Sequence, residues 1–178
     1  MSPLGIVPTG GGRYERQSEV PDGNAGVRIS MLRLAALIRE GAGSSLIRGY
    51  AATMASPEIN LGAVERLTTW VRGRMVYAPD PPEVDRIMAP EAVLEEITRT
   101  GRAVGDCAAY VSLLGGLLTA LGMPVEVVLI SKDADQVYRH VALAAYDGDG
   151  RRVPVDVSGE YAVGWEEPNW TAKEVIPI

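Results

Sequence analysis

Three residue types that together can carry out nucleophilic catalysis follow one another along the chain. Cys107 is the only cysteine and His140 the only histidine among 178 residues, and Asp156 comes after them. A thiolate can attack a carbonyl carbon, an imidazole can carry the protons, and a carboxylate can orient the imidazole. The order therefore predicts a Cys-His-Asp centre that attacks amide or ester carbonyls.

The cysteine occupies a position that favours a reactive thiol. Asp106 is a typical N-cap residue and precedes an apolar run that reads as a buried helix, so Cys107 falls in its first turn. Free backbone N–H groups and the helix dipole stabilise negative charge there, and the N–H of Cys107 can serve as an oxyanion donor. The alternative is a buried, unreactive cysteine, since free cysteines are often buried.

The histidine and the aspartate are expected on two strands of one hairpin, over residues 139–146 and 151–157. His140 and Asp156 are centred on Gly148 in the sequence. An odd loop, such as one of three residues, would place them directly opposite each other on one face. An even loop without a bulge would place them on opposite faces.

Each partner also has a simpler interpretation. A lone histidine is often structural, and an acid on a strand is often a solvated surface residue. Asp156 lies between Val155 and Val157, and side chains alternate across a sheet. The carboxylate is therefore expected on the face opposite to the two valines.

The elements that must position these residues are helices first and strands afterwards, which predicts an α+β fold. The first helix is expected to end at Gly41 and Gly43, and Pro90 is expected to open a later one. The chain from Ser158 onward is expected to be irregular. The predicted helices cover 27–40, 45–54, a segment after Pro57, 91–99 and 106–121, and the predicted strands cover 75–77, 125–130, 139–146 and 151–157.

Composition divides the chain into three parts. Residues 1–26 are rich in Gly, Pro and Ser and are expected to form a flexible arm that could dock on a partner. Residues 27–168 form the predicted domain, and residues 169–178 form a C-terminal tail. The length suits one folded domain better than two.

Charge and residue counts exclude several classes of function. A net charge of −6 without a basic run argues against nucleic-acid binding, and one cysteine with one histidine argues against a zinc site. The run Asp147–Gly150 resembles the start of a calcium loop, but its closing acid would fall on Ser158, so a hairpin turn is expected. No cofactor, signal peptide or membrane span is predicted.

The residues around the proposed centre resemble the transglutaminase-like superfamily, whose members share a papain-like core. The matching residues are Gly105-Asp106-Cys107, Leu113-Leu114, Leu117-Leu118, Ala120 to Pro124, His140-Val141 and Val155-Asp156. The resemblance implies a central helix that carries the cysteine and packs on a small antiparallel sheet. It also implies Cys107 as nucleophile, His140 as base and Asp156 as the orienting acid.

The likeness is closer to a subgroup found in tailed bacteriophages and prophages, and it covers about residues 27–168. The residues that carry it are Ile29 to Arg39, Ile47-Arg48, Trp70 to Tyr77, Asp80 to Pro82 and Gly164-Trp165. Trp70 and Tyr77 are candidates for the substrate or oxyanion site, although both residue types usually belong to a core. The chain departs from these relatives at Ala108-Ala109, where they carry acidic residues.

Two functions from different classes are compatible with these features. The first is a cysteine peptidase or amidase that acts on a protein or peptide, or a transferase that uses the same thioester intermediate. The second is a structural or adaptor protein of a phage virion that contacts other phage proteins through residues 1–26. The expected location is the host cytoplasm or the virion, without secretion by a signal peptide.

Overall fold

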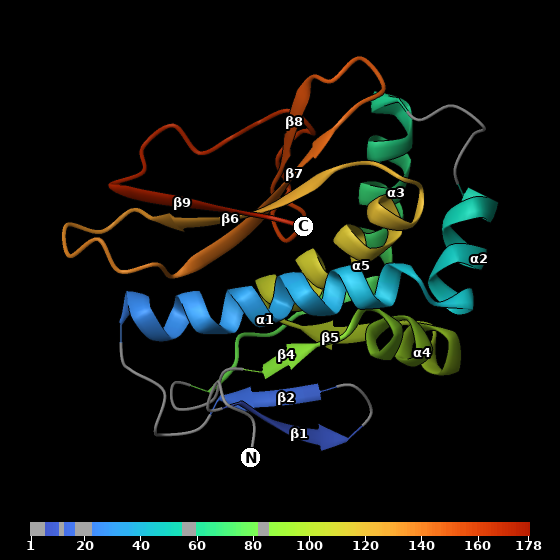
Figure 1. Ribbon diagram of the computed structural model, residues 1–178, viewed down its shortest axis with the longest axis horizontal. Helices are drawn as coiled ribbons and strands as arrows, with labels where there is room; N and C mark the ends of the chain where they lie inside the picture. The colour runs from blue at the N-terminus through green and yellow to red at the C-terminus, as the bar shows by residue number, and fades with distance from the viewer. Residues whose placement is uncertain (1–5, 11–12, 17–22, 55–59, 82–85) are drawn as a thin grey trace.

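The computed structural model describes residues 6–10, 13–16, 23–54, 60–81 and 86–178. Helices and strands both contribute to these ranges, in the α+β arrangement that the sequence predicts (Figure 1). The helices are α1 (Asn24–Ala42), α2 (Ser45–Met54), α3 (Leu61–Arg74), α4 (Pro90–Thr100) and α5 (Cys107–Ala120). The strands are β1 (Ile6–Gly10), β2 (Arg13–Arg16), β3 (Met75–Tyr77), β4 (Arg86–Met88), β5 (Ala103–Gly105), β6 (Val125–Ser131), β7 (His140–Tyr146), β8 (Arg152–Val155) and β9 (Ala172–Pro177).

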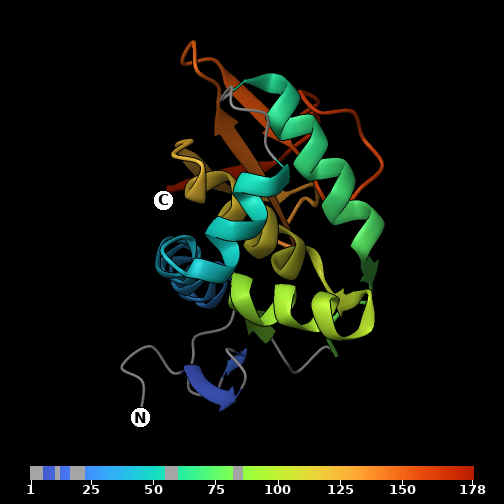
Figure 2. The ribbon, with the colours of Figure 1, turned by 90° about the vertical axis from the view of Figure 1, so that its right-hand side faces the viewer.

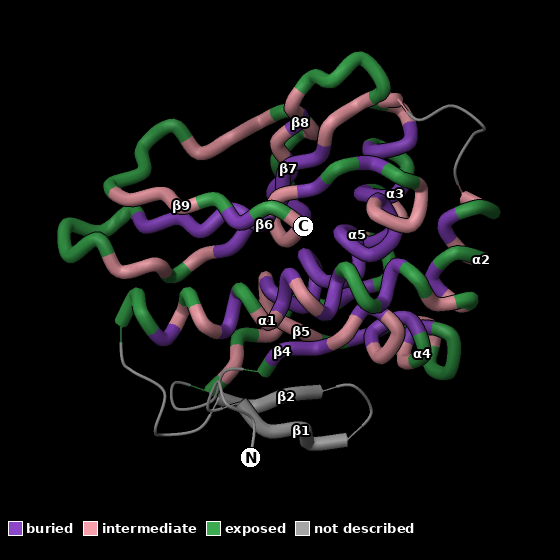
Figure 3. The backbone as a smooth tube through the Cα atoms, in the orientation of Figure 1, coloured by how far each residue is buried: buried purple, intermediate pink, exposed green. Residues whose placement is uncertain are grey.

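Helix α5 is the centre of the fold. Its residues from Ala108 to Leu118 are buried, as expected for a helix that is apolar on every side. The other helices and strand β7 pack around it, and Figure 3 shows it buried along most of its length. Gly116 allows the first turn of α4 to approach closely, because a Cβ atom there would lie 2.7 Å from the Pro90 ring.

The main sheet is antiparallel, with the strand order β8-β7-β6-β9. One face of β7 joins the main core through Val141, Leu143 and Ala145, and Leu143 lies against α5 beside Gly115. The other face carries Ala142 and Ala144. The small antiparallel sheet packed on a central helix agrees with the predicted architecture.

The segment between β8 and β9 lies against the face of the sheet that points away from α5. Trp165 and Glu166 from this segment line a small cavity together with Val128 and Ala142 of the sheet. Glu166 accepts hydrogen bonds from Arg152 at 2.9 Å and from Lys173 at 2.8 Å. These ion pairs tie the segment to the strands on either side of it in the sequence.

Helix α1 corrects one expectation about glycine. The sequence predicts that Gly41 and Gly43 end this helix, but Gly41 is its penultimate residue and Gly43 is the C-cap. A Cβ atom on Gly41 would lie 2.5 Å from the Glu91 carboxylate on α4. Gly41 therefore allows two helices to pack closely, whereas Gly43 follows the helix end.

The prediction of an irregular chain after Ser158 was wrong for residues 172–177. These residues form β9, which pairs antiparallel with β6 at the edge of the main sheet. The strand lies in the predicted C-terminal tail, and its partner is distant in the sequence, so local pattern gave no sign of it. Two short strands, β4 and β5, were also not predicted, and β5 pairs in parallel with the predicted β3.

Part of the predicted N-terminal arm is paired with the domain. Strand β1 pairs with β2, and β2 pairs with β4 (Figure 1). Helix α1 begins at Asn24, within the range predicted as arm. Residues 1–5, 11–12 and 17–22 lie outside the described residues, so the extent and partner of the arm stay predictions.

Neither a metal-binding cluster nor a membrane-spanning helix is present in the described part of the chain. No group of three or more His, Cys, Asp or Glu residues there could hold a metal ion. No helix within the same ranges is both long enough and apolar enough to cross a membrane. The thiol of Cys107 is free.

Candidate active site

Cys107 is the first residue of α5, and the local sequence explains its place. The side chain of the N-cap residue Asp106 accepts a hydrogen bond from the backbone N–H of Ala109 at 3.1 Å, as the sequence predicts. The cap leaves other N–H groups of the first turn without a partner inside the helix. The residue is partly exposed, and its thiol lies at the end of the helix that stabilises negative charge.

His140 begins β7 and joins the two other predicted residues. Its Nε2 atom lies 2.9 Å from Oδ2 of Asp156, within hydrogen-bond distance. Cys107 also acts on the ring, since its interaction with His140 helps to raise the pKa of the imidazole. The imidazole side chain is 32% exposed, so it is open to a substrate while Nε2 faces Asp156.

The surroundings of His140 favour its protonated form. Burial alone would lower its pKa, but hydrogen bonds to Asp156 and Cys107, together with their negative charges, raise the pKa to about 10. The imidazole is therefore a cation at neutral pH. It can stabilise a thiolate at Cys107 and later supply a proton to a leaving group.

Asp156 follows the last residue of β8 and is held on both carboxylate oxygens. Oδ1 accepts bonds from the Ser158 hydroxyl at 3.1 Å and from the Gly159 N–H at 3.3 Å, while Oδ2 faces His140. Burial raises the pKa of Asp156, but the bonds from His140, Ser158 and Gly159 outweigh it and leave this pKa below its usual value. The carboxylate thus stays ionised and oriented toward the imidazole.

The hairpin register differs from the predicted one by a single step. Leu143 pairs with Val155 and Tyr146 with Arg152, so the hairpin is centred on Asp149 and not on Gly148. Continuing this register places Asp156 beside Ala142, two residues along the strand from His140. The prediction that the two residues lie directly opposite was therefore wrong, although they share a face as diagonal neighbours.

The turn explains why they share a face. The N–H of Asp147 donates to the carbonyl of Arg151, which leaves a three-residue loop over 148–150. Gly150 adopts a φ of 76°, the left-handed conformation that closes such a loop and that favours glycine. Of the two loop parities that the sequence leaves open, the structure has the odd one, and this parity keeps both side chains on one side.

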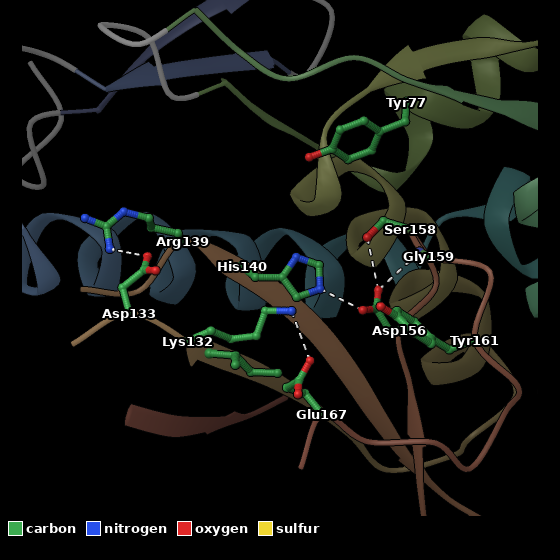
Figure 4. Close-up of a pocket in the computed structure, with 11 residues that line it drawn as sticks. Tyr77, Lys132, Asp133, Arg139, His140, Asp156, Ser158, Gly159, Tyr161 and Glu167 are labelled. Carbon is green, nitrogen blue, oxygen red and sulfur yellow. Dashed lines mark hydrogen bonds and ion pairs between the residues drawn. The ribbon is translucent and has the colours of Figure 1, made fainter. Parts of the chain in front are cut away.

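A cavity of about 430 Å³ opens in front of the imidazole (Figure 4). His140 and Asp156 lie in its wall, and Tyr77 and Tyr161 contribute aromatic rings. The charged side chains around it include two ion pairs, Lys132 with Glu167 at 3.0 Å and Arg139 with Asp133 at 2.9 Å. The cavity therefore combines aromatic surface with polar groups, as is usual for ligand pockets.

Trp70 and Tyr77 were both candidates for the substrate or oxyanion site, and of these two Tyr77 lines the cavity. Tyr77 on β3 lines it, and burial together with the negative charges of Cys107, Asp106 and Asp156 raises the pKa of its phenol. The phenol therefore keeps its proton and can donate a hydrogen bond. Trp70 is not among the cavity residues, and it packs on the core with its ring centre 5.9 Å from that of Tyr50.

Several residues at the site were not predicted from the sequence. Arg72, at the end of α3, donates hydrogen bonds to backbone carbonyls around Asp156. Tyr161 and Glu167 reach the cavity from the segment after β8, which the sequence describes only as irregular. The stretch from Trp70 to Tyr77 contains Arg72, but it contains Arg74 as well, so no local signal distinguished Arg72.

Comparisons with known proteins were made on this chain. A model of the transglutaminase-like superfamily matches residues 48–157, a range that contains Cys107, His140 and Asp156. The comparison with curated proteins gave no match. A similar solved structure, from Parabacteroides distasonis ATCC 8503 and described as "a putative protease", shares 20% identity with a TM-score of 0.49. The alignment covers 71% of this chain and 26% of that one.

Proposed function

The chain belongs to the transglutaminase-like superfamily, and from that premise we propose that it is a cysteine-nucleophile enzyme acting on amide bonds of proteins or peptides. The observation that carries the proposal is the 2.9 Å contact of Asp156 with His140, whose imidazole also has its pKa raised by Cys107. Nucleophile, proton carrier and orienting acid are thereby assigned to three neighbouring side chains. Acyl transfer by a thiolate needs these three groups near one another, and their proximity supports the proposal.

In the first half-reaction, Cys107 Sγ attacks the carbonyl carbon of the substrate and forms a C–S bond. The carbonyl oxygen becomes an oxyanion, for which the backbone N–H of Cys107 is a donor at the start of α5. The protonated His140 gives its proton to the leaving nitrogen as the C–N bond breaks. An amine departs and a thioester on Cys107 remains.

In the second half-reaction, neutral His140 takes a proton from an incoming water molecule. The water oxygen attacks the thioester carbonyl, the C–S bond breaks, and a carboxylic acid leaves. A primary amine in place of water would give a new amide by the same steps. We propose hydrolysis as the main outcome, since water reaches an open cavity without a binding site of its own.

The cavity supports a peptide segment as the substrate. Its volume of about 430 Å³ lies within the range of small-ligand sites and suits a few residues of a chain. Tyr77 lines the cavity with a phenol that keeps its proton, and we propose it as a second hydrogen-bond donor to the substrate carbonyl. Tyr161 provides apolar contact area on another part of the wall.

Labelling of the only cysteine tests the nucleophile directly. We expect iodoacetamide to modify Cys107 faster than free cysteine at pH 6, because His140 and the helix start stabilise the thiolate. His140→Gln should remove most of this advantage, and Arg28→Gln, at an exposed position of α1, should not change it. A wild-type rate no higher than that of free cysteine at pH 6 would argue strongly against an enzyme.

Turnover needs a separate measurement. A panel of peptides with fluorogenic C-terminal amides, followed by mass spectrometry of the intact protein, should reveal an acyl group on Cys107. Added primary amine then measures how the thioester divides between water and amine. Cys107→Ala should abolish both signals, and a panel without any acylation would contradict the proposal for peptide substrates.

The phage origin and the adaptor role stay predictions. The two alanines after the nucleophile, Ala108 and Ala109, are buried against the core, and a Cβ atom on Gly105 would lie 2.4 Å from that of Ala109. Small residues therefore suit this packing whatever the function. Stoichiometric copies of the chain in purified virions would favour the adaptor, and labelling of Cys107 would favour the enzyme.

A further inference from the structure

Arg72 makes an unusual set of contacts for a residue outside the proposed triad. Its Nη2 atom donates to the carbonyl of Asp156 at 2.7 Å and to the carbonyl of Tyr161 at 2.8 Å. Its Nε atom lies 3.3 Å from the carbonyl of Val157. One guanidinium from α3 therefore holds three backbone carbonyls of the chain segment that follows β8.

The two carbonyls that share Nη2 are the ends of a short loop, residues 156–161, which we call the acid loop. Its first residue presents the carboxylate that faces His140, and its last presents a ring that lines the cavity. The loop is also closed from inside, since Ser158 and Gly159 donate to Oδ1 of Asp156. The guanidinium thus links the first and last residues of the acid loop.

The far end of the acid loop is supported from outside as well. The ring of Tyr161 stacks on that of Trp165, with ring centres 3.7 Å apart and an interplanar angle of 9°. Gly159 allows the ring of Tyr161 to approach, because a Cβ atom there would lie 2.7 Å from it. The ring therefore has one position, and that position depends on the same backbone that carries the acid.

We propose that Arg72 is a positioning residue that couples the orientation of Asp156 to the cavity wall formed by Tyr161. The inference rests on the proposed function, because it assigns Arg72 a role in that reaction. Loss of the guanidinium frees both ends of the acid loop at once, so it weakens the contact with His140 and displaces the wall. A lysine cannot replace it, because its single ammonium cannot span three carbonyls in the plane of a guanidinium.

A positioning role differs from a merely structural one in a measurable way. His140 is the only histidine, so its imidazole gives an isolated signal whose titration can be followed by NMR. The contact with Asp156 helps to raise the pKa of this ring to about 10. A variant that only destabilises the chain leaves this pKa unchanged in the folded protein, whereas a displaced Asp156 lowers it.

The experiment compares Arg72→Met, Arg72→Lys and the control Arg74→Met in folded protein, with folding checked by circular dichroism. Arg74 lies on the same last turn of α3, is exposed, and donates to the carbonyl of Gly101 at 3.4 Å. We expect the pKa of His140 to fall by about one pH unit in Arg72→Met and by less in Arg72→Lys. Arg74→Met should match the wild type.

Turnover of the same variants gives a second readout. Arg72→Lys should lower kcat about tenfold and raise KM, because both ends of the acid loop move. Tyr161→Ala should raise KM and leave the pKa of His140 unchanged, since the carboxylate keeps its place. If Arg72→Met fails to fold, the pKa of His140 in Arg72→Lys tests the positioning role by itself.

The outcomes separate the two proposals. A wild-type pKa of His140 in every folded Arg72 variant would overturn the positioning role. A lowered pKa in the Arg72 variants, in a protein that acylates no peptide, would uphold the coupling of Arg72 to the His140–Asp156 pair and contradict only the proposed enzyme function.

Discussion

Cys107 and Asp156 reach the same imidazole from two regions that are built by different forces. The helix behind Cys107 is buried among other helices and a sheet, and its side chains from Ala108 to Leu118 pack in the core. The segment that contains Asp156 is held by hydrogen bonds and ion pairs, through Arg72, Lys132 and Arg152. Apolar packing fixes the position of the thiol, and directional polar bonds fix the position of the carboxylate.

The difference teaches which kind of change each region tolerates. Burial is not directional, so the helix keeps its place as long as the core keeps its volume. A hydrogen bond fails when its geometry is lost, so the polar segment depends on particular atoms. Changes in the core should therefore mainly affect stability, and changes around the acid should mainly affect the chemistry. Figure 2 shows α3, the source of Arg72, running beside the sheet that carries His140.

The largest effect is expected on the polar side. Asp156→Asn should lower kcat about 10³-fold, roughly 4 kcal/mol of barrier, because the amide neither fixes the ring tautomer nor stabilises the imidazolium. The pKa of His140 should fall well below 10, as measured by NMR of the single imidazole. Asp149→Asn, on the exposed hairpin turn, is the matched control. A kcat within threefold of wild type would show that the acid does not orient the imidazole.

A core substitution in α5 tests the other region. Leu117 is fully buried, so Leu117→Ala should lower the free energy of unfolding by about 3–5 kcal/mol, as measured by urea denaturation. The protein that remains folded should keep kcat within a factor of about three. Leu32→Ala removes a side chain that is 40% exposed and should change stability by less than about 0.5 kcal/mol. A large loss of kcat in folded Leu117→Ala would contradict the expectation that changes in the core mainly affect stability.

The free energy of unfolding should depend on pH through His140 and Asp156. The pKa of His140 is about 10 in the folded protein and near 6.5 in the unfolded chain. Its contribution to the free energy of unfolding is therefore complete below pH 6.5 and is lost as the pH rises through 10. The folded pKa of Asp156 is lowered, so its contribution is present above about pH 4 and is lost at more acidic pH.

Urea denaturation of the wild type and of Asp156→Asn between pH 3 and pH 10 measures this contribution. We expect the wild type to exceed the variant by about 1–3 kcal/mol near pH 6, a typical value for hydrogen bonds to charged groups. The difference should shrink toward both ends of the range. A difference that stays constant with pH would mean that the two groups are not coupled in the folded state.

The smallest effect is expected at the rim of the cavity. Lys132 is an exposed cation paired with Glu167, so Lys132→Ala should change stability by less than about 1 kcal/mol. It should raise KM two- to fivefold and leave kcat unchanged, because the ion pair contacts the cavity and not the imidazole. Arg28→Ala, which breaks an exposed pair with Glu174 elsewhere, should change neither constant. A tenfold loss of kcat in Lys132→Ala would assign Lys132 to the reaction itself.

How much the sequence predicts also differs between the regions. The helix of Cys107 could be predicted because its signals are local: an N-cap at Asp106, an apolar run, and Gly122 beyond the last turn with a φ of 82°. The α+β class followed in the same way from periodicity. The hairpin was predicted with the parity of its loop left open, and its centre lies one residue away from the expected one.

The polar region could not be predicted because its contacts are long-range. Arg72 is more than eighty residues away from the carbonyls that it binds, and its neighbours in the sequence give no sign of that partner. The stacked pair of Tyr161 and Trp165 lies in a segment without periodicity. Strand β9 was not predicted for the same reason, since its pairing with β6 depends on tertiary contacts rather than on its own residues.

The three-residue turn at the tip of the hairpin has a consequence for how this chain can vary in length. Because strand side chains alternate with a period of two, inserting or deleting one residue between Asp147 and Arg151 would rotate everything after it by half a turn. The carboxylate would then exchange sides with its neighbouring valines, although no atom near the imidazole had been edited. Homologues with longer tips should therefore differ in steps of two, or compensate with a bulge farther along the ribbon.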